Sequence, residues 1–381
     1  MRLGTVRVTH AIQLPLLPLA DGPPILDQRA RGGEGGTSFV GTPSRSVLNP
    51  PSSTGMGFWS INPYVGCEFG CSYCYARDTH RWLVERAVAR IELEVPSSDE
   101  EPSSDTALTQ LTSLSPPDAF ERQIFVKTEV ADVLRRTLDP ARIGTAAIVI
   151  GTATDPYQPA ERRFALTRRI LQTLLPYRGL TIGIITKSAL VARDLDLLVP
   201  LAERHDLRVN LSLATTDVDV LRKLEPRTPL PHARLRALRL LTASGIHAGV
   251  MLAPILPGIT DGWDSLAKVM EGAKEAVARF VSGIPLRLGA TARARLLTVL
   301  RQEFPELVSR YEQHYGKRTN ASAAYRKALA RRIRLLQEVY GFPVTPSRAS
   351  GTRQRNGAPT SGPRRGRTRS GSVSRPANPA A

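Results

Sequence analysis

The chain contains 381 residues, of which 41% are hydrophobic, and this is enough apolar material for a large buried core. No stretch approaches about 20 uninterrupted apolar residues, the length that a membrane-spanning helix requires, so we expect no membrane partner. Lysine and arginine number 52 against 34 acidic residues, a net charge of +18, which favours partners that carry phosphate.

Part of this positive charge lies in the segment 347–381, which has eight arginines and no acidic residue in a run of mostly Ser, Gly, Pro, Thr and Ala. Such a composition cannot bury enough apolar surface to fold, so we expect a disordered Arg-rich tail. The rest of the chain keeps 44 basic against 34 acidic residues. This smaller excess fits a solvated surface as well as a groove for DNA or RNA, and both interpretations stay open.

In chain order, residues 1–55 are rich in Gly, Pro and Ser and predict an irregular N-terminal lead-in. An acidic, turn-rich stretch predicts an exposed low-complexity insertion at about 95–117. Elsewhere strand-like and helix-like patterns alternate. The strand-like runs are 57–61, 124–127, 146–151, 181–186, 207–213 and 247–253. The helical patterns are 79–93, 130–138, 161–175, 191–205 and 231–244.

This alternation predicts an α/β fold with a parallel sheet, which either opens into a doubly wound sheet or curls into a barrel. We place the main domain at 56–288 and a helical C-terminal extension at 289–346. A segment with three cysteines follows the first core strand and precedes the first helical pattern. It should therefore lie at the carboxyl end of the sheet, where both kinds of α/β fold place their chemistry.

Cys67, Cys71 and Cys74 are the only cysteines in the sequence. Three thiolates on one tight loop can bind three irons of a [4Fe–4S] cube and leave the fourth iron without a protein ligand. The alternatives are a zinc site completed by His80, free thiols, or one disulfide with a spare cysteine. We expect no disulfide framework, because the cysteine count is odd and the first residues do not look like a secretory signal. A reducing cytoplasm would suit both the thiolates and an oxygen-sensitive cluster.

The spacing of these cysteines, three residues and then two with an aromatic before the last, resembles the signature of radical S-adenosylmethionine (SAM) enzymes. The resemblance implies a partial (β/α)6 TIM-type barrel from about 58 to 288, with SAM bound to the open iron. Further segments resemble the spore photoproduct lyase-like (DNA-repair-photolyase-like) group, in the same order along the chain. They are 62–67, 151–159, 185–187, 211–213, 224–228 and 250–255.

The resemblance also implies roles for residues at the strand ends. Thr154 and Asp155 match the place where the family binds the methionine amino group of SAM, and Asp155 has the charge that an ammonium requires. Lys187 matches a lysine near the SAM carboxylate, and Ser212 matches a serine that bonds the ribose. The alternatives are an aspartate that caps backbone amides, a lysine that reaches solvent and a serine satisfied within its sheet.

Other matches concern the adenine of SAM. Tyr73 lies where the family packs an aromatic residue whose backbone approaches this base, although a tyrosine of the core would look the same. Met251, Leu252 and Pro254 would form an apolar wall for it, and any barrel strand would also be apolar there. Arg227 could meet a phosphate or a carboxylate.

The implied reaction is reductive cleavage of SAM to a 5′-deoxyadenosyl radical, which abstracts hydrogen from an unidentified substrate, with nucleic acid as one candidate. It requires a reducing partner such as flavodoxin or ferredoxin. Spore photoproduct lyase has a cysteine that returns a hydrogen atom, and the matching position here is Ala153. Tyr157 is a conceivable donor, but a packing role suits it better. The alternative function is an iron–sulfur electron carrier or sensor without SAM chemistry.

Overall fold

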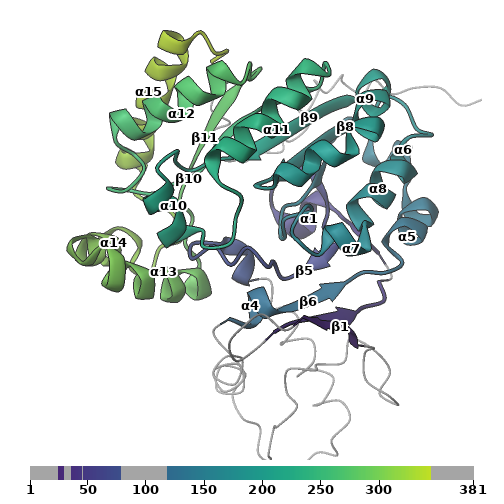
Figure 1. Ribbon diagram of the computed structural model, residues 1–381, viewed down its shortest axis with the longest axis horizontal. Coiled ribbons are helices and arrows are strands. Elements are labelled where there is room, and N and C mark those ends of the chain that lie inside the picture. Colours follow the sequence, from purple (N-terminus) through teal and green to yellow (C-terminus); the bar gives the residue numbers. More distant parts are fainter. Residues whose placement is uncertain (1–24, 30–35, 45, 79–117, 345–381) are drawn as a thin grey trace, which may run out of the picture. The chain divides into compact units, whose positions relative to one another are not determined.

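The computed structural model describes residues 25–29, 36–44, 46–78 and 118–344 (Figure 1). Three expectations lie outside these residues and stay predictions: the helix at 79–93, the insertion at about 95–117 and the Arg-rich tail at 347–381. The zinc alternative also depends on His80, which is outside them too.

Six parallel strands form the main sheet, and their order in space is their order in the chain. They are β4 (Trp59–Ile61), β7 (Ile148–Ile150), β8 (Thr181–Thr186), β9 (Asp206–Ser212), β10 (His247–Ile255) and β11 (Val281–Pro285). A short antiparallel strand, β3 (Leu48–Asn49), pairs with β4 at one edge. A doubly wound sheet would reverse its strand order near the middle, whereas this sheet progresses in one direction as a barrel does. The expected partial (β/α)6 barrel is therefore the fold.

Helices and 3-10 turns connect the strands and cover them. Between β4 and β8 these are η1 (Tyr75–Arg77), α4 (Ala119–Arg122), α5 (Val130–Thr137), α6 (Pro140–Ile143), α7 (Glu161–Phe164) and α8 (Leu166–Leu174). Between β8 and β11 they are η2 (Ala189–Asp194), α9 (Leu195–Arg204), α10 (Val218–Leu224), α11 (Pro231–Ala243) and α12 (Trp263–Glu275). α9 packs on β9, and α11 and α12 pack on β10 (Figure 1). The helix predicted at 161–175 is broken in two at Ala165, whose φ is 50°.

A second, four-stranded sheet has the order β1-β2-β6-β5. Its strands are β1 (Ile25–Arg29), β2 (Thr37–Gly41), β6 (Gln123–Val126) and β5 (Tyr64–Val65). The strand predicted at 124–127 therefore exists, but it lies outside the barrel sheet. The lead-in is also more regular than expected, because it contains β1, β2, β3 and α1 (Pro51–Thr54). Phe39 and Val40 are buried there against a partner strand distant in sequence, which local composition does not reveal.

Helices follow the last strand, β11. They are α13 (Ala290–Glu303), η3 (Pro305–Leu307), α14 (Val308–Tyr315) and α15 (Ala323–Tyr340). α15 packs on α12 and on β11, where the Gln337 side chain donates a hydrogen bond of 2.7 Å to the carbonyl oxygen of Val281. No helix in the part of the chain that the structure describes is both long and apolar enough to cross a membrane.

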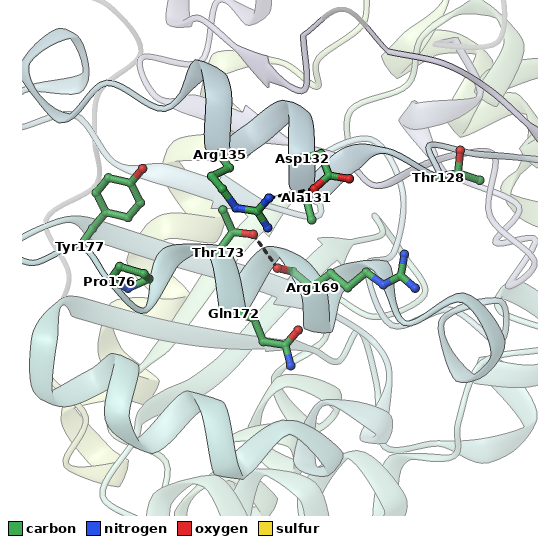
Figure 2. Close-up of a pocket in the computed structure, with 9 residues that line it drawn as sticks. All are labelled: Thr128, Ala131, Asp132, Arg135, Arg169, Gln172, Thr173, Pro176 and Tyr177. Atoms are coloured by element: carbon green, nitrogen blue, oxygen red, sulfur yellow. Dashed lines mark hydrogen bonds and ion pairs between the residues drawn. The ribbon is translucent and has the colours of Figure 1, made fainter.

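A surface hollow of about 480 Å³ lies between α5 and α8, and exposed polar side chains surround it (Figure 2). Arg135 on its rim donates a hydrogen bond of 2.9 Å to Asp132 of the same helix. None of its lining residues belongs to the cysteine segment or to the carboxyl ends of the main strands. This hollow is therefore not the site that the sequence predicts.

Candidate cofactor site

The cysteine segment is a tight loop that follows β4 and the short strand β5. Its first cysteine is fixed by a hydrogen bond of 2.9 Å from the Cys67 amide to the carbonyl oxygen of Phe120. Gly66 just before it has a φ of 89°, and a Cβ there would lie 2.8 Å from the carbonyl oxygens of Phe120 and Gln123. Only glycine fits this position, because the backbone is left-handed and two carbonyl groups approach it closely.

The three thiols are free; Cys67 and Cys71 are buried, and Cys74 is half-buried. Burial raises the pKa of each of Cys67, Cys71 and Cys74, because a buried thiolate loses its hydration. A metal centre that binds thiolates would offset this cost. Within the described residues, no three His, Cys, Asp or Glu side chains converge closely enough to ligate a single metal ion. A cube spreads its thiolate ligands over three different irons, so it does not require such convergence.

The loop after β7 is hydrogen-bonded to the backbone of the cysteine segment. The Gln158 side chain donates to the Gly66 carbonyl oxygen at 3.2 Å and accepts from the Glu68 amide at 2.8 Å. The Thr154 hydroxyl donates to the same Gly66 oxygen at 2.6 Å. Thr154 thus contacts the backbone of the cysteine loop. Gln158, which is fully buried, was not recognised from the sequence.

Asp155 lies beside Thr154 and receives three hydrogen bonds. Its carboxylate accepts from the Thr186 hydroxyl at 2.6 Å, from the Lys187 amide at 2.7 Å and from the Tyr157 amide at 2.9 Å. Burial raises the pKa of Asp155, although these hydrogen bonds act in the opposite direction. Asp155 therefore caps backbone amides, as one interpretation predicted. A carboxylate has about four acceptor positions, so one remains for a further donor.

Lys187 directly follows β8, Ser212 ends β9, and Met251 pairs with Ser212 within β10, so the three side chains share one face of the sheet. The Lys187 ammonium donates to the Ser212 hydroxyl at 3.2 Å and lies 5.7 Å from the centre of the Tyr73 ring. Burial acts to lower the pKa of Lys187, but nearby negative groups, Glu225 first, raise it overall. Leu252 does not join this group. It is fully buried in the main core on the opposite face, because neighbours in a strand alternate.

The buried carboxylate of Glu225 is connected to these residues through Tyr73 and Arg234. Glu225 accepts hydrogen bonds from the Tyr73 hydroxyl, from the Thr228 hydroxyl at 2.9 Å and from the Arg234 guanidinium at 2.5 Å. Glu225 and Arg234 have exposed fractions of 0% and 1%. Arg234 was missed in the sequence, although it repeats with Leu238 and Leu241 on the buried face of the helix predicted at 231–244. An arginine at a core position of an amphipathic helix is a signal that a buried acid faces it.

The remaining expected residues have mainly structural contacts. Ala153 packs against the cysteine loop, and its amide donates to the Asn62 side chain at 2.7 Å. The Tyr157 side chain is buried, which fits the packing role. Arg227 lies against Gly70 of the cysteine loop, and its guanidinium is 3.9 Å from the Glu121 carboxylate.

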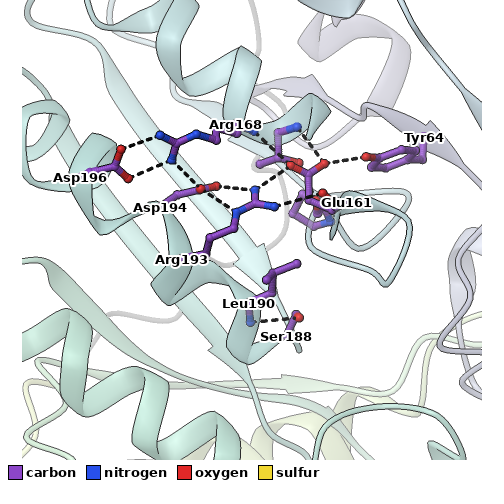
Figure 3. Close-up of polar contacts among 10 residues, drawn as sticks. Tyr64, Glu161, Arg168, Ser188, Leu190, Arg193, Asp194 and Asp196 are labelled. Carbon is purple, nitrogen blue, oxygen red and sulfur yellow. Dashed lines mark hydrogen bonds and ion pairs between the residues drawn. The ribbon is translucent and has the colours of Figure 1, made fainter. Parts of the chain in front are cut away.

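A second polar group, centred on the buried Glu161, joins residues of several elements (Figure 3). Glu161 accepts hydrogen bonds from the Tyr64 hydroxyl at 2.5 Å and from Arg193 at 3.0 Å, and Arg193 also pairs with Asp194. Arg168 joins the group through Asp194. These contacts connect β5 with η2 and the start of α8, so the group braces the fold.

The comparisons with known proteins show the family to which the chain belongs. The family model of the radical SAM superfamily matches residues 61–270, a range that contains all three cysteines and the ends of β7 to β10. The chain belongs to the radical SAM superfamily.

Among similar proteins, an uncharacterized protein of Mycobacterium tuberculosis is 33% identical over 300 residues, which cover 78% of this chain and 79% of that protein. An uncharacterized protein of Methanocaldococcus jannaschii is 25% identical over 218 residues, 57% of this chain and 68% of the relative. The structure of spore photoproduct lyase complexed with dinucleoside spore photoproduct aligns with a TM-score of 0.54 and 16% identity over 80% of each chain. This likeness confirms the expected resemblance at the level of the fold.

Enzymes of this superfamily use a [4Fe–4S] cluster and SAM, and the residues present fit both. Three free thiols on one loop, two of them buried, would supply three ligands and leave the fourth iron for SAM. When bound, the pair supplies reductive SAM cleavage and a radical that abstracts hydrogen from a substrate. The chain is therefore a radical SAM enzyme, and it requires an external reductant.

Proposed function

We propose that Cys67, Cys71 and Cys74 hold the cluster and that Asp155, Lys187 and Ser212 bind SAM. One observation carries this proposal. The Lys187 ammonium lies beside Ser212 and 5.7 Å from the centre of the Tyr73 ring, and Tyr73 stands between Cys71 and Cys74, so this cation and the cysteine loop are close together. Carboxyl ends of four neighbouring parallel strands supply the surrounding residues.

Lys187 and Asp155 each keep hydrogen-bonding capacity that SAM could use. Lys187 has two ammonium hydrogens beyond the one given to Ser212, and a SAM carboxylate would accept them. Asp155 has an acceptor position left, and an ammonium there would offset the burial that raises its pKa. Met251 supplies apolar contact from the same face of the sheet. Tyr73 lines the site with its ring, whereas Thr154 and Leu252 support it through the loop and the core.

The substrate is proposed to be a nucleic acid, because the sequence is strongly basic and a neighbour in fold is complexed with a dinucleoside photoproduct. Ala153 supplies no thiol next to the site, so the reaction does not return hydrogen from this position. We further propose flavodoxin or ferredoxin as the reductant and the cytoplasm as the compartment, since three free thiols require a reducing environment.

Anaerobic reconstitution followed by an assay for 5′-deoxyadenosine tests the reaction. We expect about four irons and four sulfides per chain, and loss of the cluster when Cys67, Cys71 or Cys74 is replaced by alanine. Reduction with dithionite in the presence of SAM should then release 5′-deoxyadenosine. Stoichiometric zinc without iron uptake would overturn the cluster assignment. An intact cluster that binds no SAM would leave an electron carrier or sensor instead.

A further inference from the structure

Two consecutive residues in the middle of the cysteine loop are hydrogen-bonded to the end of α10. Ser72 and Tyr73 lie between the second and third cysteines. The Ser72 amide and hydroxyl both donate to the carbonyl oxygen of Leu224, at 2.9 and 3.2 Å, and the Tyr73 hydroxyl donates to Glu225. All four residues are buried. The end of α10 therefore fixes the part of the loop that separates two of the thiols.

The same contacts continue to the strand ends. Arg234 binds the Glu225 carboxylate with one nitrogen and donates with another to the carbonyl oxygen of Ser212 at 2.7 Å. Its third nitrogen donates to the Pro229 carbonyl oxygen at 2.9 Å. The Ser212 hydroxyl in turn accepts from Lys187. An unbroken chain of polar contacts thus joins the cysteine loop to two of the proposed SAM-binding side chains.

The Glu225 carboxylate also lies close to the cysteine loop. It accepts a hydrogen bond from the Tyr73 hydroxyl, and Tyr73 stands between Cys71 and Cys74 in the chain. Glu225 and its partner Arg234 are buried, so solvent screens their charges only weakly. The pair is therefore placed to influence a charge that develops at the cysteine loop.

We propose that Glu225 and Arg234 are positioning residues, which hold the cysteine loop and the Lys187–Ser212 face in register and set the reduction potential of the cluster. This inference rests on the proposed function, because it assumes that SAM binds at Lys187 and Ser212. One residue pair can do both, because Glu225 contacts the cysteine loop through Tyr73 and Arg234 contacts the end of β9 through Ser212.

The chain offers a matched control. Glu161 is also fully buried and pairs with an arginine and a tyrosine hydroxyl, Arg193 and Tyr64, but none of them contacts Lys187, Ser212 or the segment between the cysteines in the hydrogen bonds described above. Glu225→Gln and Glu161→Gln should cost similar folding stability. Only Glu225→Gln should alter cofactor properties.

Three measurements on the reconstituted protein test the proposal: SAM affinity by calorimetry, the midpoint potential of the cluster by spectroscopic titration, and thermal unfolding. Glu225→Gln should weaken SAM binding at least about tenfold and raise the potential, because a negative charge near the cluster opposes reduction. Tyr73→Phe, which removes one hydroxyl, should weaken SAM binding about fivefold and remains informative if Glu225→Gln does not fold.

Equal effects of Glu225→Gln and Glu161→Gln on affinity and potential, or unchanged SAM binding in Tyr73→Phe, would overturn the positioning role. A wild-type protein that holds a cluster but binds no SAM would instead overturn the proposed function. The two failures are thereby distinguished.

Discussion

Asp155 combines support of the fold with a proposed binding role. Its carboxylate holds the Thr186 hydroxyl and the Lys187 amide, so it fixes the end of β8 on which the Lys187 side chain begins. Removing its charge therefore affects the site in two ways. The proposed ammonium contact is lost, and the backbone that presents Lys187 loses an anchor.

We expect Asp155→Asn to retain the cluster but to weaken SAM binding by about 2–5 kcal/mol, because a buried ammonium loses its charged partner. Ser212→Ala removes one neutral hydrogen-bonding group and should cost only about 1 kcal/mol. Calorimetric titration of both variants with SAM gives the comparison. The assignment of Asp155 is wrong if its variant binds SAM as the wild type does.

Replacement of Gly66 tests whether the backbone of the cysteine loop tolerates a side chain at this position. Gly66→Ala should destabilise the fold by about 1–3 kcal/mol or more, because its φ is 89° and two carbonyl oxygens crowd the new methyl group. Gly183→Ala is the control, since its Cβ would meet only Val149 methyl groups at 3.6 Å and beyond. Chemical unfolding of the apo proteins and the iron content after reconstitution measure the difference. Equal stability of the two variants would contradict this reading of the loop.

Much of the candidate site could be proposed from the sequence. The cysteines were proposed from their local spacing, and Asp155, Lys187 and Ser212 from a resemblance to the family at the strand ends. Glu225 lies in the matched segment 224–228 but had no role assigned to it, and Arg234 was not noticed, since their importance comes from a contact between a loop and a helix face. Leu252 was expected at the adenine wall but lies in the main core, because an apolar strand does not show which of its alternating faces lines a site.

At the scale of elements, His205 joins three segments at the amino-terminal end of the strands. It follows α9, its Nδ1 accepts from the Leu180 amide just before β8, and its Nε2 lies 3.2 Å from the Leu174 carbonyl oxygen at the end of α8. Both contacts are satisfied by a neutral ring with its proton on Nε2. Burial is the main cause that lowers the pKa of His205, and Arg204 and Arg178 add to it.

A His with a lowered pKa makes stability depend on pH. Below the ordinary value of 6.5 the unfolded chain binds a proton that folded His205 resists, so the free energy of unfolding should fall as the pH decreases from there. His205→Gln should flatten this decrease, because an amide keeps hydrogen bonds without titrating. Chemical unfolding of the apo proteins between about pH 5 and pH 8 measures it. Parallel pH curves for wild type and variant would refute this role of His205.

The elements themselves were predictable to different degrees. The five barrel strands from β4 to β10 lie in apolar, β-rich runs of the sequence and were expected close to their observed places. β11 was not, because Val281–Pro285 includes Gly283 and Pro285. Only its pairing with β10 makes it a strand. β1 and β2 were missed as well, because β2 pairs with β6, a strand distant in the chain, and β1 in turn pairs with β2.

At the scale of the whole molecule, the main property is its positive net charge. The net charge of +18 includes eight arginines at 347–381, beyond the residues that the structure describes. Deleting this segment should leave folding and SAM cleavage intact, while weakening salt-sensitive binding to DNA or RNA. Salt titrations of binding by the full-length and truncated chains provide the measurement. Loss of SAM cleavage on truncation would place the segment in the active site instead.

The strand order of the main sheet also bears on how such a protein can diverge. When strands follow one another in space as in the chain, new material can be added after the last strand without rethreading the earlier ones. Here that last position, beside β11, is occupied by α15, whose Gln337 binds the carbonyl group of Val281. Material at this edge of the sheet can therefore change without touching the cysteine loop, which follows the first strand, whereas α13 is tied to that loop because it packs against η1 directly after it.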